Sequence, residues 1–135
     1  MKELTVEAKR ENLLLVQSLI DEELEAADCP MATQIAIDVA VEELFVNIAS
    51  YAYGEKTGQA TVQVTIHEDP TSADIKFIDS GKQYDPLAKP DPDVTLAACD
   101  RKKGGLGIFM VKNSMDDVKY EYKDGQNVLT LIKNL

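Results

Sequence analysis

Residues 31–53 read MATQIAIDVAVEELFVNIASYAY. This stretch is long and mostly apolar, and it lies between Pro30 and Gly54, two residue types that interrupt helices. We therefore expect a helix from Met31 to Tyr53 that ends at Gly54. The polar residues of this helix do not form one band, because on a helical wheel they fall on two separate faces.

The first polar stripe contains Gln34, Asp38 and Glu42, and the second contains Glu43, Asn47, Ser50 and Gly54. One polar stripe is expected as the solvated face of an amphipathic helix. The second needs another reason, because a buried carboxylate is costly unless it is paired or bound to a cation. Glu43 and Asn47, one turn apart, offer adjacent oxygen ligands of the kind that magnesium prefers, and Glu43 is suited to general-base catalysis. A hydrogen-bonded pair on a half-exposed helix is the alternative.

Periodicity predicts the elements on either side of this helix. Helical spacing of apolar residues predicts helices over residues 8–27 and 106–114. Alternation with a period of two predicts strands over residues 2–6, 60–66, 73–79, 118–122 and 128–132. The last two strands are joined by a tight Asp124-Gly125 turn, and the middle two form a hairpin. These elements predict a two-layer α/β sandwich, with a mostly antiparallel sheet covered on one face by helices, in a single domain over residues 1–135.

The composition narrows the class of partners. The chain has 135 residues, of which 44% are hydrophobic, and a formal net charge of -10. Such a surface repels nucleic-acid phosphates and anionic membranes, and it suits a basic patch on a protein partner. Cys29 and Cys99 have no metal-ligand spacing and no signal peptide is evident, so we expect free thiols in a cytoplasmic protein. Met31, Met110 and Met115 are expected to fill gaps in the core.

Two further motifs contain candidate ligand-binding residues. Asp79-Ser80-Gly81 ends a predicted strand, where a carboxylate can accept a hydrogen bond from an amine such as that of adenine and glycine allows a flat ligand to approach. Gly104-Gly105-Leu106-Gly107 precedes an apolar helical run from Ile108, and free N–H groups at a helix start bind phosphate. Lys102 and Lys103 come just before. A plain turn and a flexible hinge are the alternatives.

These motifs, in this order, resemble the ATP-binding domain of the GHKL superfamily, which includes histidine kinases and gyrase. Glu43-x-x-x-Asn47 resembles its N box, Asp79-Ser80-Gly81 its G1 box and Gly105-Leu106-Gly107 its G2 box. The long irregular stretch between the last two motifs resembles the mobile ATP lid. Over nearly the whole chain, the sequence is most similar to bacterial anti-sigma factors that are serine-protein kinases, whose corresponding helix also ends in Ala-Tyr.

The resemblance implies a Bergerat-type ATP-binding fold and a role for each motif. Glu43 would be the general base that activates a serine of the partner, and Asn47 would hold magnesium. The residues implied in binding ATP are Asn47, Asp79, Gly81, Lys102, Lys103, Gly104, Gly105, Leu106, Gly107 and Ile108. The implied substrate is a small anti-anti-sigma protein, the implied second partner is a sigma factor, and the implied assembly is a homodimer.

Three residues near the second polar stripe depart from the pattern of these kinases. Val46 stands where threonine is frequent, Ile48 where alanine is common, and Tyr51 where histidine is common. Because they lie beside the expected metal, they leave a second hypothesis open, a nucleotide-controlled binding module without kinase activity. A third hypothesis is an α/β interaction domain that binds no nucleotide.

Overall fold

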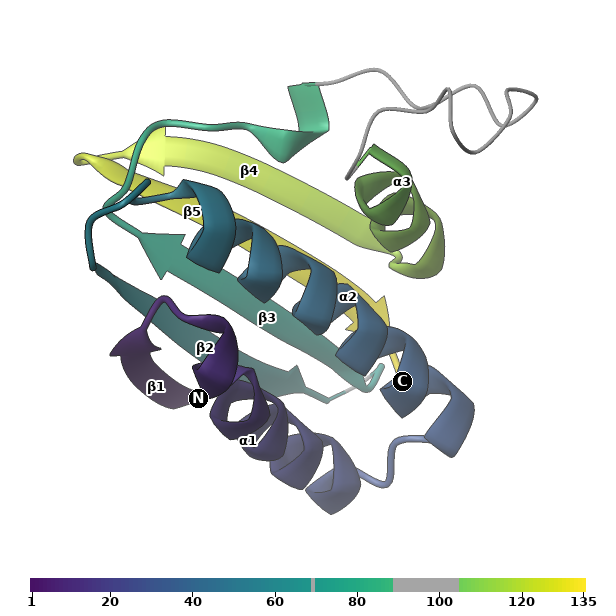
Figure 1. Ribbon diagram of the computed structural model, residues 1–135. Coiled ribbons are helices and arrows are strands. Elements are labelled where there is room, and N and C mark those ends of the chain that lie inside the picture. Colours follow the sequence, from purple (N-terminus) through teal and green to yellow (C-terminus); the bar gives the residue numbers. More distant parts are fainter. Residues whose placement is uncertain (69, 89–104) are drawn as a thin grey trace.

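The computed structural model describes residues 1–68, 70–88 and 105–135, and it contains a five-stranded antiparallel sheet in the order β1-β2-β3-β5-β4 (Figure 1). The strands are β1 (Lys2–Glu7), β2 (Gln59–His67), β3 (Ser72–Asp79), β4 (Asp117–Lys123) and β5 (Gln126–Asn134). The helices of the described residues are α1 (Leu13–Ala26), α2 (Met31–Tyr51) and α3 (Gly105–Ser114), with 3-10 turns η1 (Arg10–Asn12) and η2 (Pro86–Ala88).

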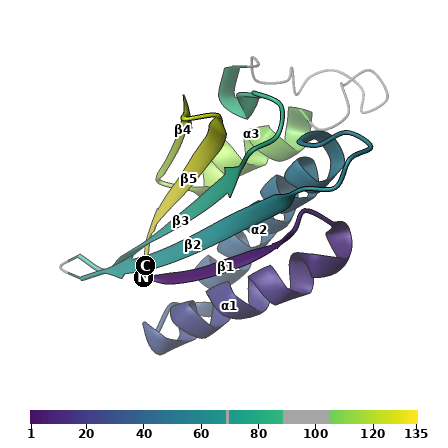
Figure 2. The ribbon, with the colours of Figure 1, turned by 90° about the vertical axis from the view of Figure 1, so that its left-hand side faces the viewer.

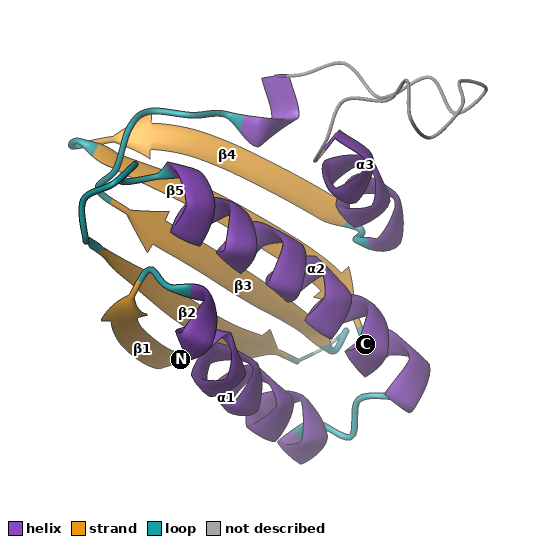
Figure 3. Cartoon of the chain, viewed as in Figure 1, coloured by secondary structure: helices purple, strands orange, loops and turns teal. Residues whose placement is uncertain are grey.

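The α-helices of the described part lie together on one face of the sheet, as Figures 2 and 3 show. This arrangement confirms the predicted sandwich and both predicted hairpins. The turn between β4 and β5 has positive φ at Asp124 (54°) and Gly125 (77°), the backbone of a tight hairpin turn. Among the described residues, no helix is both long and apolar enough to cross a membrane.

The first helix begins later than its sequence predicts. Residues 8–12 were expected to be helical, but the Ala8 amide donates to the Gly58 carbonyl at 2.8 Å and so continues the pairing of β1 with β2. The Asn12 side chain then donates to the Glu7 carbonyl at 2.9 Å. Helix α1 therefore starts only at Leu13, after the 3-10 turn η1. Helix α2 ends at Tyr51, two residues before its predicted end, a difference within the usual uncertainty of helix ends.

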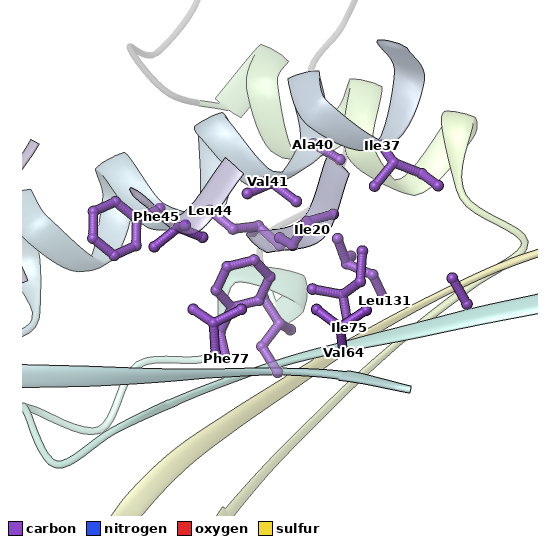
Figure 4. Close-up of a cluster of buried hydrophobic side chains, with 14 of the residues drawn as sticks. Ile20, Ile37, Ala40, Val41, Leu44, Phe45, Val64, Ile75, Phe77 and Leu131 are labelled. Atoms are coloured by element: carbon purple, nitrogen blue, oxygen red, sulfur yellow. The ribbon is translucent and has the colours of Figure 1, made fainter. Parts of the chain in front are cut away.

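The core lies between the helices and the sheet, and its side chains come from both layers (Figure 4). Strand β3 alternates as predicted, with Ala73, Ile75 and Phe77 fully covered. Ile75 and Phe77 face Val41 and Phe45 of α2 across the layer interface. Burial of each such large side chain contributes about 1.5–3 kcal/mol, so this interface fixes α2 on the sheet.

Helix α2 does not use a polar stripe as its solvated face, contrary to the simplest expectation. Two residues of the first stripe turn toward α1, where Gln34 is buried and Asp38 half-buried, while the third, Glu42, is exposed. The rest of the solvated face is apolar, with Met31 67% and Ile35 56% exposed. The expectation that the methionines fill core gaps is therefore wrong for Met31 and for Met110, which is 53% exposed, and right for Met115.

Candidate functional site

A pocket opens where the C-terminal half of α2 faces the ends of β3 and β5. It encloses about 460 Å³, counting the solvent at its mouth. Its lining residues are Leu44, Asn47, Ile48, Ala52, Phe77, Asp79, Lys82, Tyr84, Pro86, Tyr120, Asn127 and Leu129. The walls are mostly aliphatic and aromatic, with a few polar groups between them, which is the usual make-up of a small-molecule site.

Asp79 is the buried acid of this pocket, and it is 6% exposed. Its Oδ1 accepts hydrogen bonds from the Gly81 amide at 2.9 Å and from Asn127 Nδ2 at 3.0 Å. Among the described residues, no donor contacts its other oxygen, Oδ2. One oxygen of the carboxylate is thus held by the protein and the other is left for a donor in the pocket.

Asn127 holds this network together, and the sequence analysis missed it. Its Nδ2 donates to Asp79 and also to the Lys82 carbonyl at 2.9 Å. Its Oδ1 accepts from the Tyr84 amide at 3.1 Å and from the Tyr120 hydroxyl at 2.6 Å. The alternation along β5 was the one indication in the sequence. Asn127 is a polar residue at a position that, by this alternation, faces inward.

The turn after Asp79 is fastened to the end of α2. A side chain on Gly81 would collide with the backbone of Ala52, and the Lys82 amide donates to the Ala52 carbonyl at 2.7 Å. The Tyr53 hydroxyl accepts from the Ser80 amide at 2.9 Å and donates to the Gln59 carbonyl at 2.5 Å. Gly81 is thus required by packing inside the protein, a reason that the sequence analysis did not identify.

Glu43 and Asn47 lie on the flank of α2 that faces α3. Asn47 lines the pocket, and Glu43 stands one turn before it. Burial, and secondarily the charge of Glu42, raises the pKa of the Glu43 carboxyl above its ordinary value. A side chain on Gly107 would collide with that carboxylate. The first turn of α3 therefore lies directly against Glu43, where a helix N-terminus favours negative charge.

The predicted site residues of the three motifs converge only in part within the described residues. Asn47 and Asp79 line one pocket, Gly81 packs against Ala52 and is not among the lining residues, and Gly105, Leu106 and Gly107 form the first turn of α3. This helix begins one residue before its predicted start, and Ile108 packs against the core. Lys102, Lys103 and Gly104 lie outside the described residues, as does Cys99.

The described residues thus form an antiparallel sheet covered on one face by helices, with a pocket between a central helix and the strand ends, an arrangement compatible with the predicted ATPase domain. Comparison with known families agrees: residues 6–133 match the histidine kinase-like ATPase domain. The chain belongs to this family.

Curated relatives within the family are named as protein kinases. The serine-protein kinase RsbW of Listeria monocytogenes serovar 1/2a is 33% identical over 98 residues, which cover 69% of this chain and 61% of the relative. The serine/threonine-protein kinase BtrW of Bordetella bronchiseptica is 26% identical over 98 residues, covering 73% of this chain and 68% of that protein. The chain thus spans less than two thirds of the length of the RsbW relative.

A solved structure supports the fold. The crystal structure of the RsbU and RsbW domains of Rv1364c from Mycobacterium tuberculosis matches with a TM-score of 0.66 and 15% sequence identity. The match covers all of this chain and 33% of that one. At this identity the likeness concerns the fold alone.

Proposed function

We propose that the chain binds ATP in the pocket between α2 and the ends of β3 and β5. The pocket offers apolar walls for a flat base, including Ile48 and Phe77, and one open carboxylate oxygen on Asp79 for its exocyclic amine. The phosphates then extend toward Asn47 and the N-terminal turn of α3, whose N–H groups and helix dipole favour anions. The observation that carries the proposal is the contact of Gly107 with Glu43, which joins the third motif to the first.

A magnesium ion fits the same flank of α2. Neither Glu43 nor Asn47 has a side-chain hydrogen bond among the described residues, so their oxygens are free to face a cation or its water. Asn47 would hold the ion together with the phosphates, and the ion would neutralise charge on the nucleotide. The described residues contain no group of three or more acidic, cysteine or histidine side chains arranged to hold a metal, so a stable site requires the nucleotide.

We further propose that the chain is a serine-protein kinase, with Glu43 as its general base. The serine oxygen of a protein substrate attacks the terminal phosphorus of ATP, the bond from that phosphorus to the ADP oxygen breaks, and the serine proton passes to Glu43. The raised pKa of Glu43 supports this role, because a base with a pKa nearer to neutrality accepts a proton more readily.

The proposed substrate is a small anti-anti-sigma protein, and the proposed second partner is a sigma factor held inactive in the cytoplasm. Support comes from the names of the relatives, which are serine-protein kinases of the RsbW type. We also propose that the chain acts as a single-domain homodimer.

Phosphate transfer is tested directly with radiolabelled ATP, magnesium and purified small regulators encoded beside the gene for this chain. The proposal expects label on a serine of one such regulator, located by mass spectrometry. If the chain binds ATP but labels none of them, and none binds it in a nucleotide-dependent way, the assigned substrate class is wrong.

One observation favours a second candidate, a nucleotide-controlled binding module without kinase activity. Ile48 lines the pocket one residue after Asn47, at a position where these kinases commonly have alanine, and its bulk narrows the space beside the expected ion. This candidate predicts ATP-dependent capture of a partner without phosphoserine in the same assay.

A further inference from the structure

The outward surface of α1 and α2 combines two properties that rarely occur together on an exposed helix layer. Several of its large apolar side chains are exposed, and its charged side chains all have one sign. The exposed apolar residues of this outer face are Leu14 (73%), Leu15 (55%), Met31 (67%), Ile35 (56%) and Val39 (49%). Figure 1 shows the two helices side by side on the sheet.

Helical spacing places the apolar residues of α2 on one side of it. Met31, Ile35 and Val39 follow one another at intervals of four, and Glu42 continues the same side. The opposite side of α2 is already used, because Val41 and Phe45 pack on the sheet. A helix that is apolar on both sides is normally covered on both.

Helix α1 extends this surface because polar contacts hold it beside α2. Gln17 Nε2 donates to the Asp38 carbonyl at 3.2 Å, and Gln34 Nε2 donates to Glu25 Oε1 at 3.4 Å. Leu14 lies one turn before Gln17, so in this antiparallel pair it falls toward the Glu42 end of α2. Large apolar side chains that are exposed along one side of a helix, as on α2, mark an interaction site.

The charge of the same layer defines the partner. Residues 11–55 contain no lysine, arginine or histidine, and ten acidic residues, so they account for the whole net charge of -10. Those acidic residues are Glu11, Asp21, Glu22, Glu23, Glu25, Asp28, Asp38, Glu42, Glu43 and Glu55. Asp21 and Asp38 lie between the two helices and Glu43 faces α3, so the outer face has the charge of the others. A second copy bound symmetrically through this face would set acidic surface against acidic surface, and an anionic membrane or a nucleic acid would be repelled.

We propose that the outer face of α1 and α2 docks an amphipathic helix of a protein partner, with apolar side chains facing Ile35 and Val39 and lysines or arginines along its flanks. Apolar contact supplies affinity in this mode of binding, and the charged flanks supply orientation and speed of association. The proposal does not rest on kinase activity, because the face lies on the side of α2 away from the sheet and includes none of the residues assigned to ATP.

Fluorescence anisotropy with two synthetic amphipathic helices tests the proposal on the full chain. Both peptides have the same leucine face, and one carries lysines on its flanks where the other carries glutamates. We expect the leucine–lysine peptide to bind at least about tenfold more tightly than its glutamate twin, and more weakly as salt increases. Equal binding of the two peptides would overturn the charge argument.

Matched variants locate the binding on the surface. The double variant Ile35→Gln, Val39→Gln should weaken the leucine–lysine peptide at least about tenfold, while Tyr122→Gln, at an exposed aromatic on β4, should not. Glu42→Lys should weaken it more than Glu121→Lys, which changes the net charge equally on β4. If the two apolar variants, or the two charge variants, change the affinity for the peptide equally, the peptide does not bind at the outer face of α1 and α2.

Self-association and ATP affinity complete the test. If sedimentation finds a dimer that Ile35→Gln, Val39→Gln converts to monomer, a second copy occupies this face and the proposal fails. ATP affinity measured by calorimetry on the same variant should equal that of the original chain, so a failure here is distinct from a failure of the proposed function.

Discussion

The two polar flanks of α2 look alike in sequence, but their side chains have different contacts in the fold. On the flank toward α1, Gln34 is buried and finds Glu25, and Asp38 lies against Asp21. On the flank toward α3, the side chains of Glu43 and Asn47 have no hydrogen bond among the described residues. The first flank is packed between two helices, although Oδ1 of Asp21 and Oδ1 of Asp38 have no hydrogen-bond partner among the described residues, while the second is open beside the pocket that Asn47 lines. Polar groups open beside a pocket are available to a ligand, so we assign the proposed function to the second stripe.

The largest expected effect comes from removing the carboxylate of Glu43. Glu43→Gln should lower the rate of serine phosphorylation by about 10²- to 10⁴-fold, because the proton acceptor is lost, while the Kd for ATP changes little. Phosphoserine formation and calorimetry measure the two quantities. Glu121→Gln, an exposed carboxyl on β4, serves as the control. An unchanged rate in Glu43→Gln removes Glu43 from the proposed chemistry.

Asn127→Ala should cost about 2–3 kcal/mol in the free energy of unfolding, since it deletes the hub that binds Asp79, Lys82, Tyr84 and Tyr120. Urea unfolding measures the loss. The exposed Asn113, which among the described residues donates to the Phe109 carbonyl of its own helix and to no other group, provides the matched Asn113→Ala control with a much smaller loss. Equal losses in the two variants would show that the network does not stabilise the turn.

Replacement by alanine should change the free energy of unfolding by different amounts at two glycines of the site. In Gly81→Ala the new methyl group meets the backbone of Ala52, which cannot move aside, so a loss of about 1–3 kcal/mol in unfolding free energy is expected. In Gly107→Ala it meets the carboxylate end of Glu43, which can rotate away. Stability should then fall by less than about 1 kcal/mol while phosphorylation falls, because the base is displaced. The reverse order of stabilities would contradict these contacts.

The smallest effect concerns the flank of α2 that faces α1, and it depends on pH. Burial, a hydrogen bond to Asp21 and the charges of Asp21 and Glu25 raise the pKa of Asp38 to about 7. Oδ1 of Asp21 and Oδ1 of Asp38 are buried without a hydrogen-bond partner among the described residues, a situation that a proton shared between the two carboxyls relieves. Because the folded pKa is the higher one, ionisation of Asp38 destabilises the fold, so stability decreases as pH rises from about 4 through 7.

Asp38→Asn should therefore gain stability over the original chain as pH rises, reaching about 1 kcal/mol at pH ~8, a modest value because water partly screens the pair. Urea unfolding at several pH values measures this difference. Glu22→Gln, which removes an exposed carboxyl from α1, controls for the change in net charge. A difference that does not vary with pH would disprove the shared proton.

Much of the fold is predictable because local patterns specify it. The alternation in β2 and β3, the Asp124-Gly125 turn and the length of α2 each depend on residues close in sequence. The late start of α1 was not predictable, because it depends on the Ala8 amide finding Gly58 some fifty residues further along the chain.

The candidate site, like the fold, was predictable from the sequence only in part. The two stripes of α2 are visible on a helical wheel, but which one is covered depends on how α1 and α3 pack beside it. Likewise the glycine motif proposed to bind phosphate can be located, while the packing of Gly81 against Ala52 and the hub at Asn127 arise only from contacts between distant segments. Motifs therefore indicate the groups that we propose to face a ligand, while the groups that support them are visible only in the structure.

Calorimetry with ATP and magnesium measures whether the pocket at Asn47 and Asp79 holds ATP. We expect saturable binding at one site per chain, weakened at least about tenfold by Asp79→Ala because the open carboxylate oxygen is lost, and unaffected by the exposed Glu22→Gln. No binding heat at millimolar ATP, or equal affinity in Asp79→Ala and the original chain, would contradict it.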